Sequence, residues 1–298
     1  MKRALAAILG LNLLGPSLAA MEVRFEGEGC PLPTNVVQTV TAELSRLVLA
    51  DRALFQRLPA PDFEIAYHIH LDREQYRVRA KATGNAYEGV AGFTQTEQRW
   101  QLQPTRRLIS VDTRVETWRE QRTNELLAVL LHESAHAVTA AFVGRTPLWF
   151  NEGSAELLGT PAAARFKFRR QDESQRWRTL ATLLEKGELP PLRTFLAAPS
   201  YAEWDRLFGG DRSCAYTASY SLFYFFSAQP AAFRFLVAWL DSRPMDDAED
   251  LNGAFVDYLD QHWPGGLAIF KVQWHAWIKA RATATRPHSN TPGGPGRR

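Results

Sequence analysis

Length, composition and charge describe an ordinary globular protein. The chain has 298 residues, of which 45% are hydrophobic and 22% are charged, with 35 Lys and Arg against 32 Asp and Glu. It is long enough to bury one large core or two small ones. The near balance of charge argues against a dedicated binder of nucleic acid or of membrane surfaces.

The first twenty residues have the pattern of a secretory signal peptide. Residues 1–3 are Met-Lys-Arg, residues 4–14 are apolar except for Asn12, and Ser17 and Ala19 are small residues at the cleavage positions. We therefore expect an exported protein, periplasmic or secreted, from which residues 1–20 are removed; an uncleaved anchor is the alternative. The apolar run is shorter than the roughly 20 residues that span a bilayer, so no stable membrane insertion is expected after cleavage.

The two cysteines, Cys30 and Cys214, both lie in the exported part. They could pair in an oxidising compartment. The sequence does not place them within bridging distance, so the disulfide stays open at this point.

Hydrophobic periodicity predicts an α+β fold in which strands precede helices. Residues 34–58 have helical spacing, with Thr34 as the N-cap and Pro59 as the stop. Period-two alternation predicts a small, mostly antiparallel sheet from strands at 63–71, 87–93, 99–103 and 108–111. Helices are predicted at 116–143, 152–158, 166–186, 216–226, 231–240, 251–261 and 267–280.

These elements are expected to form one folded unit over residues 21–282. Its sheet-bearing part covers about 60–112, and its helical part covers about 113–282. Residues 283–298 are rich in Pro, Gly and Arg and cannot bury enough apolar surface to order, so we expect a disordered tail.

The segment His132-Glu133-Ser134-Ala135-His136 lies inside the predicted helix 116–143. Histidines four residues apart project from one side of a helix, so both imidazoles can bind one metal ion. Glu133 lies next to His132, where its carboxylate can act as general base on a water that the metal acidifies. The alternative for these five residues alone is a helix with two ordinary histidines.

The following segment, Trp149 to Glu156, supplies two further acids after a turn that contains Gly and Pro. A second helix that returns against the first would bring Glu152 to the metal. Two imidazoles and one carboxylate with an open fourth position are typical of a catalytic zinc site. Glu156, one turn later, can accept a hydrogen bond from a ligating histidine, and the alternative for it is a solvated acid.

With these two motifs the chain resembles the gluzincin metallopeptidases, and more narrowly the peptidase-MA-like group of exported bacterial proteins. The resemblance implies a zincin-like fold, one Zn²⁺ bound by His132, His136 and Glu152, Glu133 as general base, and Glu156 as the acid that orients a histidine. It covers roughly residues 60–230, and its strong motifs lie only between residues 132 and 156.

The same resemblance implies a Tyr or His beyond the third ligand that stabilises the oxyanion of the tetrahedral intermediate. Tyr216 is the candidate because it opens the relevant predicted helix, although Tyr220 and Tyr224 share its face and all three are equally consistent with packing.

Residues 91–93 are candidates for an edge strand that pairs with substrate, or for a mere hairpin strand. The Gly-x-Met-Glu-Asn signature of the aminopeptidase branch is absent from the sequence, which favours an endopeptidase.

Other features have simpler interpretations. His68 and His70 share one face of a strand and are expected on an exposed sheet face. His262, His275, Trp263, Trp274 and Trp277 are expected to pack in the C-terminal helices. The basic and aromatic run at 165–170 is expected to be a solvated helix face rather than a nucleic-acid site.

The sequence thus predicts an exported zinc endopeptidase that acts on a peptide or protein substrate. The alternative from another class is a zinc-containing binding or assembly module of the cell envelope, non-catalytic or activated by a partner. A non-peptidase zinc hydrolase is a third interpretation, but no phosphate-binding or acidic pocket lining favours it. Substrate specificity, gating, the envelope partner and the oligomeric state are not determined by the sequence.

Overall fold

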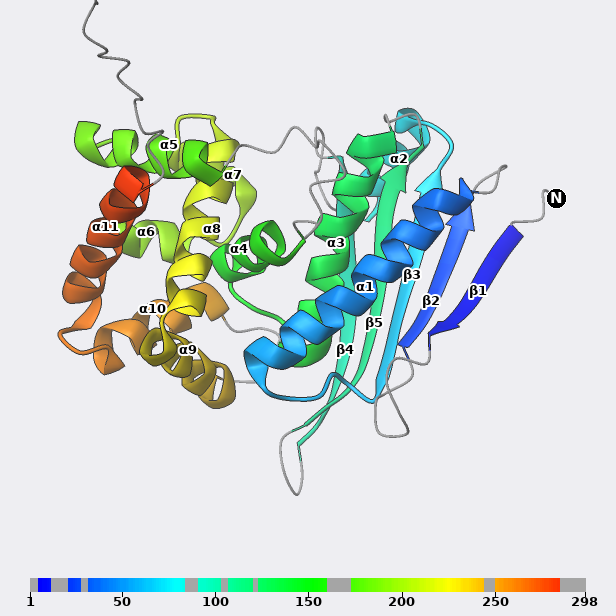
Figure 1. Ribbon diagram of the computed structural model, residues 1–298, viewed down its shortest axis with the longest axis horizontal. Coiled ribbons are helices and arrows are strands. Elements are labelled where there is room, and N and C mark those ends of the chain that lie inside the picture. The colour runs from blue at the N-terminus through cyan, green and yellow to red at the C-terminus, as the bar shows by residue number, and fades with distance from the viewer. Residues whose placement is uncertain are drawn as a thin grey trace, which may run out of the picture.

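The computed structural model describes residues 5–11, 21–27, 32–83, 91–102, 107–119, 123–159, 173–243 and 250–284. Within these ranges the protein has a sheet-bearing half and a helical half (Figure 1). The strands are β1 (Leu5–Leu11), β2 (Met21–Gly27), β3 (Asp62–His70), β4 (Gly92–Gln101) and β5 (Arg107–Trp118). The α+β class predicted from the sequence is therefore confirmed.

The sheet is mixed rather than mostly antiparallel, which corrects the prediction. The strand order is β1-β2-β3-β5-β4, with parallel pairing of β2 with β3 and of β3 with β5. The outer pairs β1–β2 and β4–β5 are antiparallel. The parallel pairs arise because helix α1 (Thr34–Phe55) connects β2 to β3 as a crossover, and because helix α2 (Arg73–Ala82) and β4 separate β3 from β5.

Two strands lie where the sequence analysis placed none. In β2, Met21, Val23 and Phe25 are buried and alternate with more exposed charged residues. β1 falls within the predicted signal peptide and pairs with β2 along its length. In a chain from which residues 1–20 have been removed, β2 is the edge strand.

Helices α1 and α3 (Thr123–Val143) cover one face of the sheet (Figure 1). Pro33, not Thr34, occupies the N-cap position of α1, and the helix ends at Phe55, where Gln56 takes a left-handed conformation. The predicted helix 116–143 is wrong at its start because β5 continues to Trp118. Val111, Thr113 and Val115 of β5 are buried in the core. Burial on this central strand outweighs the local preference for a helix at residues 116–118.

The other face of the sheet is partly covered by α2, which the sequence analysis did not predict. Its Tyr76 and Ala80 form a small core with Phe93 and Trp118. The predicted strand 87–93 lies largely outside the described residues, and the predicted strand 99–103 is the end of the longer β4.

The helical half contains α4 (Leu148–Leu158), α5 (Glu173–Lys186), α6 (Leu192–Ala197), α7 (Tyr201–Leu207), α8 (Arg212–Ala228), α9 (Pro230–Ser242), α10 (Leu251–His262) and α11 (Gly266–Ala284). The short helices α6 and α7 were not predicted. The predicted helix 166–186 is described only as α5, and the basic run at 165–170 lies outside the described residues. α11 continues two residues into the predicted tail, of which 285–298 are not described.

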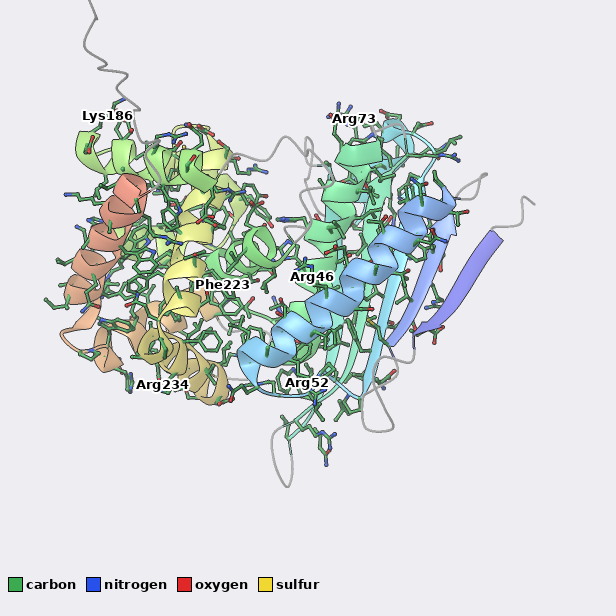
Figure 2. The ribbon with its side chains drawn as sticks, in the orientation of Figure 1. Arg46, Arg52, Arg73, Lys186, Phe223 and Arg234 are labelled. Carbon is green, nitrogen blue, oxygen red and sulfur yellow. The ribbon has the colours of Figure 1, made fainter. Side chains whose placement is uncertain are left out.

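Aromatic side chains fill the space between these helices, and Phe223 lies among them (Figure 2). Trp274 is buried and donates to Ser221 Oγ at 3.1 Å, while Trp263 and Trp277 pack against the same core, as predicted. His262 is more exposed than predicted and stacks on Tyr258.

By length and composition, residues 125–143 of α3 are the one described stretch apolar enough to cross a membrane, but most of that stretch is buried inside the fold.

Candidate metal centre and cleft

Helix α3 brings His132, Glu133 and His136 to a cleft because its other faces are apolar. Leu130, Leu131, Ala135 and Val138 are fully buried, and the helix packs against α1, β4 and β5. The helix ends at Val143, and Gly144 has the positive φ of +71° that such a terminus favours. The sequence analysis predicted this end.

Helix α4 returns against α3 and carries Glu152 and Glu156. It lies very close to α8, and the glycine between the two acids allows this approach. A Cβ at Gly153 would lie 2.3 Å from the carbonyl oxygen of Ser219 and 2.8 Å from its carbon. No larger side chain fits there without movement of α4 or α8, so Gly153 fixes the position of both acids.

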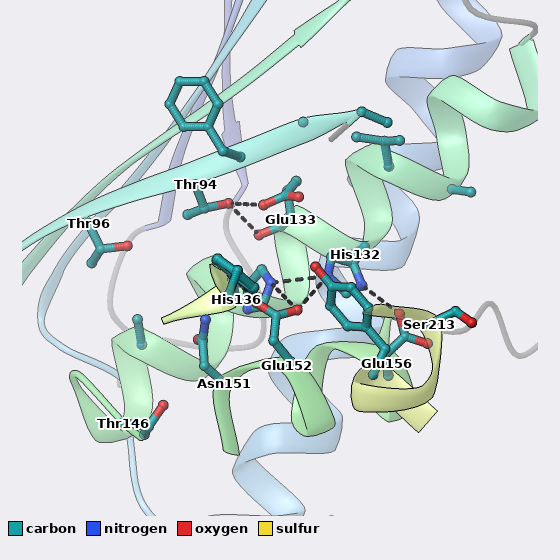
Figure 3. A pocket seen from close by; sticks show the side chains of 18 of the residues that line it. Thr94, Thr96, His132, Glu133, His136, Thr146, Asn151, Glu152, Glu156 and Ser213 are labelled. Carbon is teal, nitrogen blue, oxygen red and sulfur yellow. Dashed lines mark hydrogen bonds and ion pairs between the residues drawn. The ribbon is translucent and has the colours of Figure 1, made fainter. Parts of the chain in front are cut away.

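The nitrogen and oxygen atoms of the three predicted ligands converge (Figure 3). His132 Nε2 lies 3.1 Å from His136 Nε2 and 3.2 Å from Glu152 Oε2, and the remaining separation, from His136 Nε2 to Glu152 Oε2, is 3.6 Å. Ligands at about 2.0 Å from a tetrahedral zinc ion are about 3.3 Å apart. The donor set and its spacing therefore fit one tetrahedral ion with a fourth position open.

The negative charges of the acids around His132 and His136 also favour binding of a cation. Burial lowers the pKa of His132, but the hydrogen bond to Glu152 and the negative charges of Glu156, Glu152 and Glu133 outweigh it and raise the pKa to about 9. Burial raises the pKa of Glu152, whereas its interactions with His136 and His132 hold that pKa well below the usual range. The carboxylate is therefore ionised and ready to bind a cation.

Glu133 lies beside the ligands rather than among them. Thr94 Oγ1, on β4, donates to Glu133 Oε2 at 2.5 Å (Figure 3). At Gly92 a Cβ would lie 2.5 Å from Val129 Cγ1 on α3, so the absence of a side chain lets β4 approach the helix. Thr94 was not identified from the sequence because it belongs to no motif.

Glu156 lies where the sequence analysis placed it. Its Oε1 is 3.4 Å from His132 Nδ1, the ring nitrogen that points away from the ligand group. Arg176, on α5, donates to the other carboxylate oxygen and lies over the ring of Tyr220. This arginine was also missed, because it is distant in sequence from both motifs.

Two tyrosines line the cleft near the ligands. The Tyr216 ring lies 6.3 Å from the His132 ring, edge to face, and burial raises the pKa of Tyr216 far above its ordinary value, with Glu152 and Glu133 adding to the effect. Its phenol therefore stays protonated at neutral pH and can donate a hydrogen bond. Tyr201, on α7, donates a hydrogen bond to Glu152 Oε1, a contact that no pattern in the sequence indicated.

The cleft has a volume of about 620 Å³ and follows the edge of the sheet. Residues of β4 line one wall, among them Gly92, Thr94 and Thr96. β4 is the outermost strand on this side of the described sheet and pairs antiparallel with the next strand, β5, so Gly92 and Phe93 lie on an edge strand that is also a hairpin strand. Arg145 also lines the cleft, and its backbone N–H donates to Gln98 Oε1 on β4.

Within the described residues, two His-His-Glu groups each offer ligand atoms within 4.8 Å of one another and could hold a metal ion. The second group is His68, His70 and Glu116, on the opposite face of the sheet. His70 is buried, which corrects the prediction of an exposed face, and its Nε2 lies 2.7 Å from Glu116 Oε2. The third ligand was missed because strand pairing, not sequence proximity, places Glu116 opposite His68.

This second group is less suited to a cation than the first. Arg114 Nε lies 2.7 Å and Arg79 Nε 3.2 Å from Glu116 Oε1. Two guanidinium groups already neutralise the carboxylate, and their charge opposes a divalent ion. The group is better explained as a buried ion-pair network.

Cys214 is not in a disulfide in the structure, and its thiol lies 3.3 Å from Asp211 Oδ2. Burial, together with Asp211, raises the pKa of this thiol to about 11. Cys30 lies outside the described residues.

Comparison with known proteins adds no assignment. No protein-family model matches the chain, and no curated protein matches it significantly.

Proposed function

We propose that the protein is an exported zinc-dependent peptidase of the gluzincin type, with a zincin-like catalytic unit. The observation that carries this proposal is the convergence of His132 Nε2, His136 Nε2 and Glu152 Oε2 at tetrahedral spacing. Glu133 lies beside these atoms without being one of them. Such an arrangement leaves one coordination position for water and a base next to it.

His132, His136 and Glu152 would hold the ion. His136 Nε2 faces the other two ligand atoms, whereas its buried Nδ1 has no hydrogen-bond partner among the described residues. A zinc ion bound here supplies Lewis acidity, which lowers the pKa of a water to about 7 and polarises a carbonyl.

The chain's own groups provide the proton transfer and the orientation. Because Thr94 holds Glu133 Oε2, the other carboxylate oxygen is free to take a proton from water and return it to the leaving amine. Tyr216, protonated at neutral pH, is the donor proposed for the oxyanion. Glu156 faces His132 Nδ1 and orients the ring, and Arg176 holds Glu156 through its other carboxylate oxygen.

The proposed substrate is an extended peptide or protein segment that pairs with β4. Edge strands bind extended chains through backbone hydrogen bonds, and β4 runs along the cleft beside Glu133. A cleft lined by an edge strand suits an extended chain that continues on both sides of the cleaved bond, which supports an endopeptidase. A zinc-containing envelope module without catalysis is the alternative, and the complete set of ligands, base and supporting acid argues against it.

The test is cleavage of a diverse peptide library, with products identified by mass spectrometry. The protein should cleave peptides, and chelation of the metal should abolish cleavage. Glu133→Gln should bind one zinc ion per chain yet fail to cleave, whereas His136→Ala should lose both properties. An uncleaved library in the presence of one bound zinc ion would contradict the proposal, as would a Glu133→Gln variant that is as active as the parent.

A further inference from the structure

The two oxygens of Glu152 have different partners. Oε2 faces the histidines, 3.2 Å from His132 Nε2 and 3.6 Å from His136 Nε2. Oε1 accepts a hydrogen bond from the hydroxyl of Tyr201. Because Glu152 is only 1% exposed, water cannot easily replace that donor.

The Tyr201 ring is held in place from several sides. Tyr201 is the first residue of α7, whose N-terminus is capped by Ser200 Oγ, 3.3 Å from the backbone nitrogen of Glu203. Trp204 is fully buried and packs edge to face against the ring. The guanidinium group of Arg212 lies over the same ring, 5.3 Å from its centre.

Arg212 is itself fixed to α7. Its Nε donates to Asp205 Oδ1 at 2.8 Å, and a second bond joins the same two side chains. The ion pair therefore links α8 to α7 beside the Tyr201 ring. With the ring fixed in this way, the Tyr201 hydroxyl can hold Glu152 Oε1 in a constant position.

A phenol suits this task better than a basic side chain. It is a neutral donor at neutral pH, so it orients Glu152 without cancelling the negative charge that attracts the ion. Glu116 shows the contrary case, since Arg114 and Arg79 neutralise it. Glu152 and Glu116 therefore differ in the charge of their donors: the donor to Glu152 Oε1 is neutral, whereas the donors to Glu116 are cations.

We propose that Tyr201 is a positioning residue that makes Glu152 a ligand through Oε2 alone and so keeps the fourth coordination position open for water. This inference rests on the proposed function, because it concerns the same ion. Without the hydroxyl, Oε1 loses its partner and the carboxylate is free to turn and bind the ion through both oxygens. The expected cost is a 10- to 100-fold loss of zinc affinity, typical for removal of a group that orients a metal ligand.

The experiment compares the full-length protein with Tyr201→Phe, which keeps the ring and removes the hydroxyl. Zinc affinity is measured by competition with a chromophoric chelator, and the visible spectrum is recorded with Co²⁺ in place of zinc. We expect weaker zinc binding and weaker Co²⁺ absorption, because absorption falls as the coordination number rises. Tyr258→Phe on α10, distant in the fold from the ligand group, is the matched control and should change neither.

Loss of the hydrogen bond to the buried Glu152 is expected to lower the metal-free unfolding temperature as well, so the Co²⁺ spectrum decides between positioning and general stability. The inference holds if Tyr201→Phe loses zinc affinity and its Co²⁺ absorption weakens. It is overturned if affinity and spectrum are unchanged, or if affinity falls while the Co²⁺ spectrum stays that of the parent. A parent protein that binds no zinc would instead refute the proposed function itself.

Discussion

A buried acid between α1 and α3 should make the protein less stable as the pH rises. Asp51 is fully buried, and its Oδ2 accepts a hydrogen bond from Thr139 Oγ1 at 2.9 Å. Its Oδ1 has no partner among the described residues. Burial raises the pKa of Asp51 from 3.8 to about 7, although the hydrogen bond and the charge of Arg46 act in the opposite direction.

The sign and size of the effect follow from this difference in pKa. Between pH 4 and 7 the folded protein keeps the proton on Asp51 while the unfolded chain releases it, so rising pH favours unfolding. A difference of about three between the two pKa values corresponds to about 4 kcal/mol, which is complete only above pH 7. Asp51→Asn, which stays neutral, should therefore gain stability over the parent progressively across that range.

The assay is urea denaturation followed by tryptophan fluorescence, with a chelator present, at several pH values from 4 to 8. Burying the amide of asparagine adds a constant cost, so the diagnostic quantity is the pH dependence of the difference between variant and parent. Asp112→Asn, the same change at an exposed position of β5, is the matched control against which the pH dependence is compared. A stability difference for Asp51→Asn that does not change with pH would refute the argument.

Three further changes test the cleft. Gly153→Ala places a Cβ against the carbonyl of Ser219, so α4 must shift; we expect a loss of about 1–3 kcal/mol in unfolding free energy and weaker zinc binding in a chelator competition. Thr94→Val removes the hydrogen bond that orients Glu133 and should lower kcat about tenfold with zinc affinity unchanged. Arg145→Glu, in the lining of the cleft, should lower kcat/KM several-fold for acidic peptides and raise it for basic ones.

Each of these expectations has an outcome that contradicts it. A Gly153→Ala variant with the parent's stability would mean that α4 and α8 separate at no cost. Equal turnover by Thr94→Val would show that the base needs no orientation from β4. The exposed Arg234 on α9 provides the control Arg234→Glu, and an identical change in peptide preference there would point to net charge rather than to Arg145.

The ligand group could be anticipated because its geometry is local. His132 and His136 are one helical turn apart, and Glu152 follows after a single reversal of the chain, so helical periodicity and one turn suffice to bring them together. The residues that support them were not visible in the sequence. Tyr201 and Thr94 come from α7 and β4, and only the packing of these elements around α3 and α4 brings them to the site.

The errors in the fold have a similar origin. The spacing predicts a helix over residues 116–118, but pairing of β5 with β3 continues through Trp118 and places Glu116 opposite His68. The polar face of β3 was expected in solvent, yet α2 covers the end that carries His70. In both places long-range contacts prevail over local preference.

The remaining discrepancy concerns β1, which occupies the predicted signal peptide. Removing residues 1–20 would expose the edge of β2, whose residues Glu22, Arg24 and Glu26 are charged and alternate with the buried Met21, Val23 and Phe25. Charged edge strands resist pairing with other chains, so this edge tolerates exposure. β2 also keeps its parallel pairing with β3. We therefore expect a chain that starts at Met21 to remain monodisperse in light scattering and to bind zinc as tightly as the full chain; aggregation would show instead that β1 is a permanent part of the sheet.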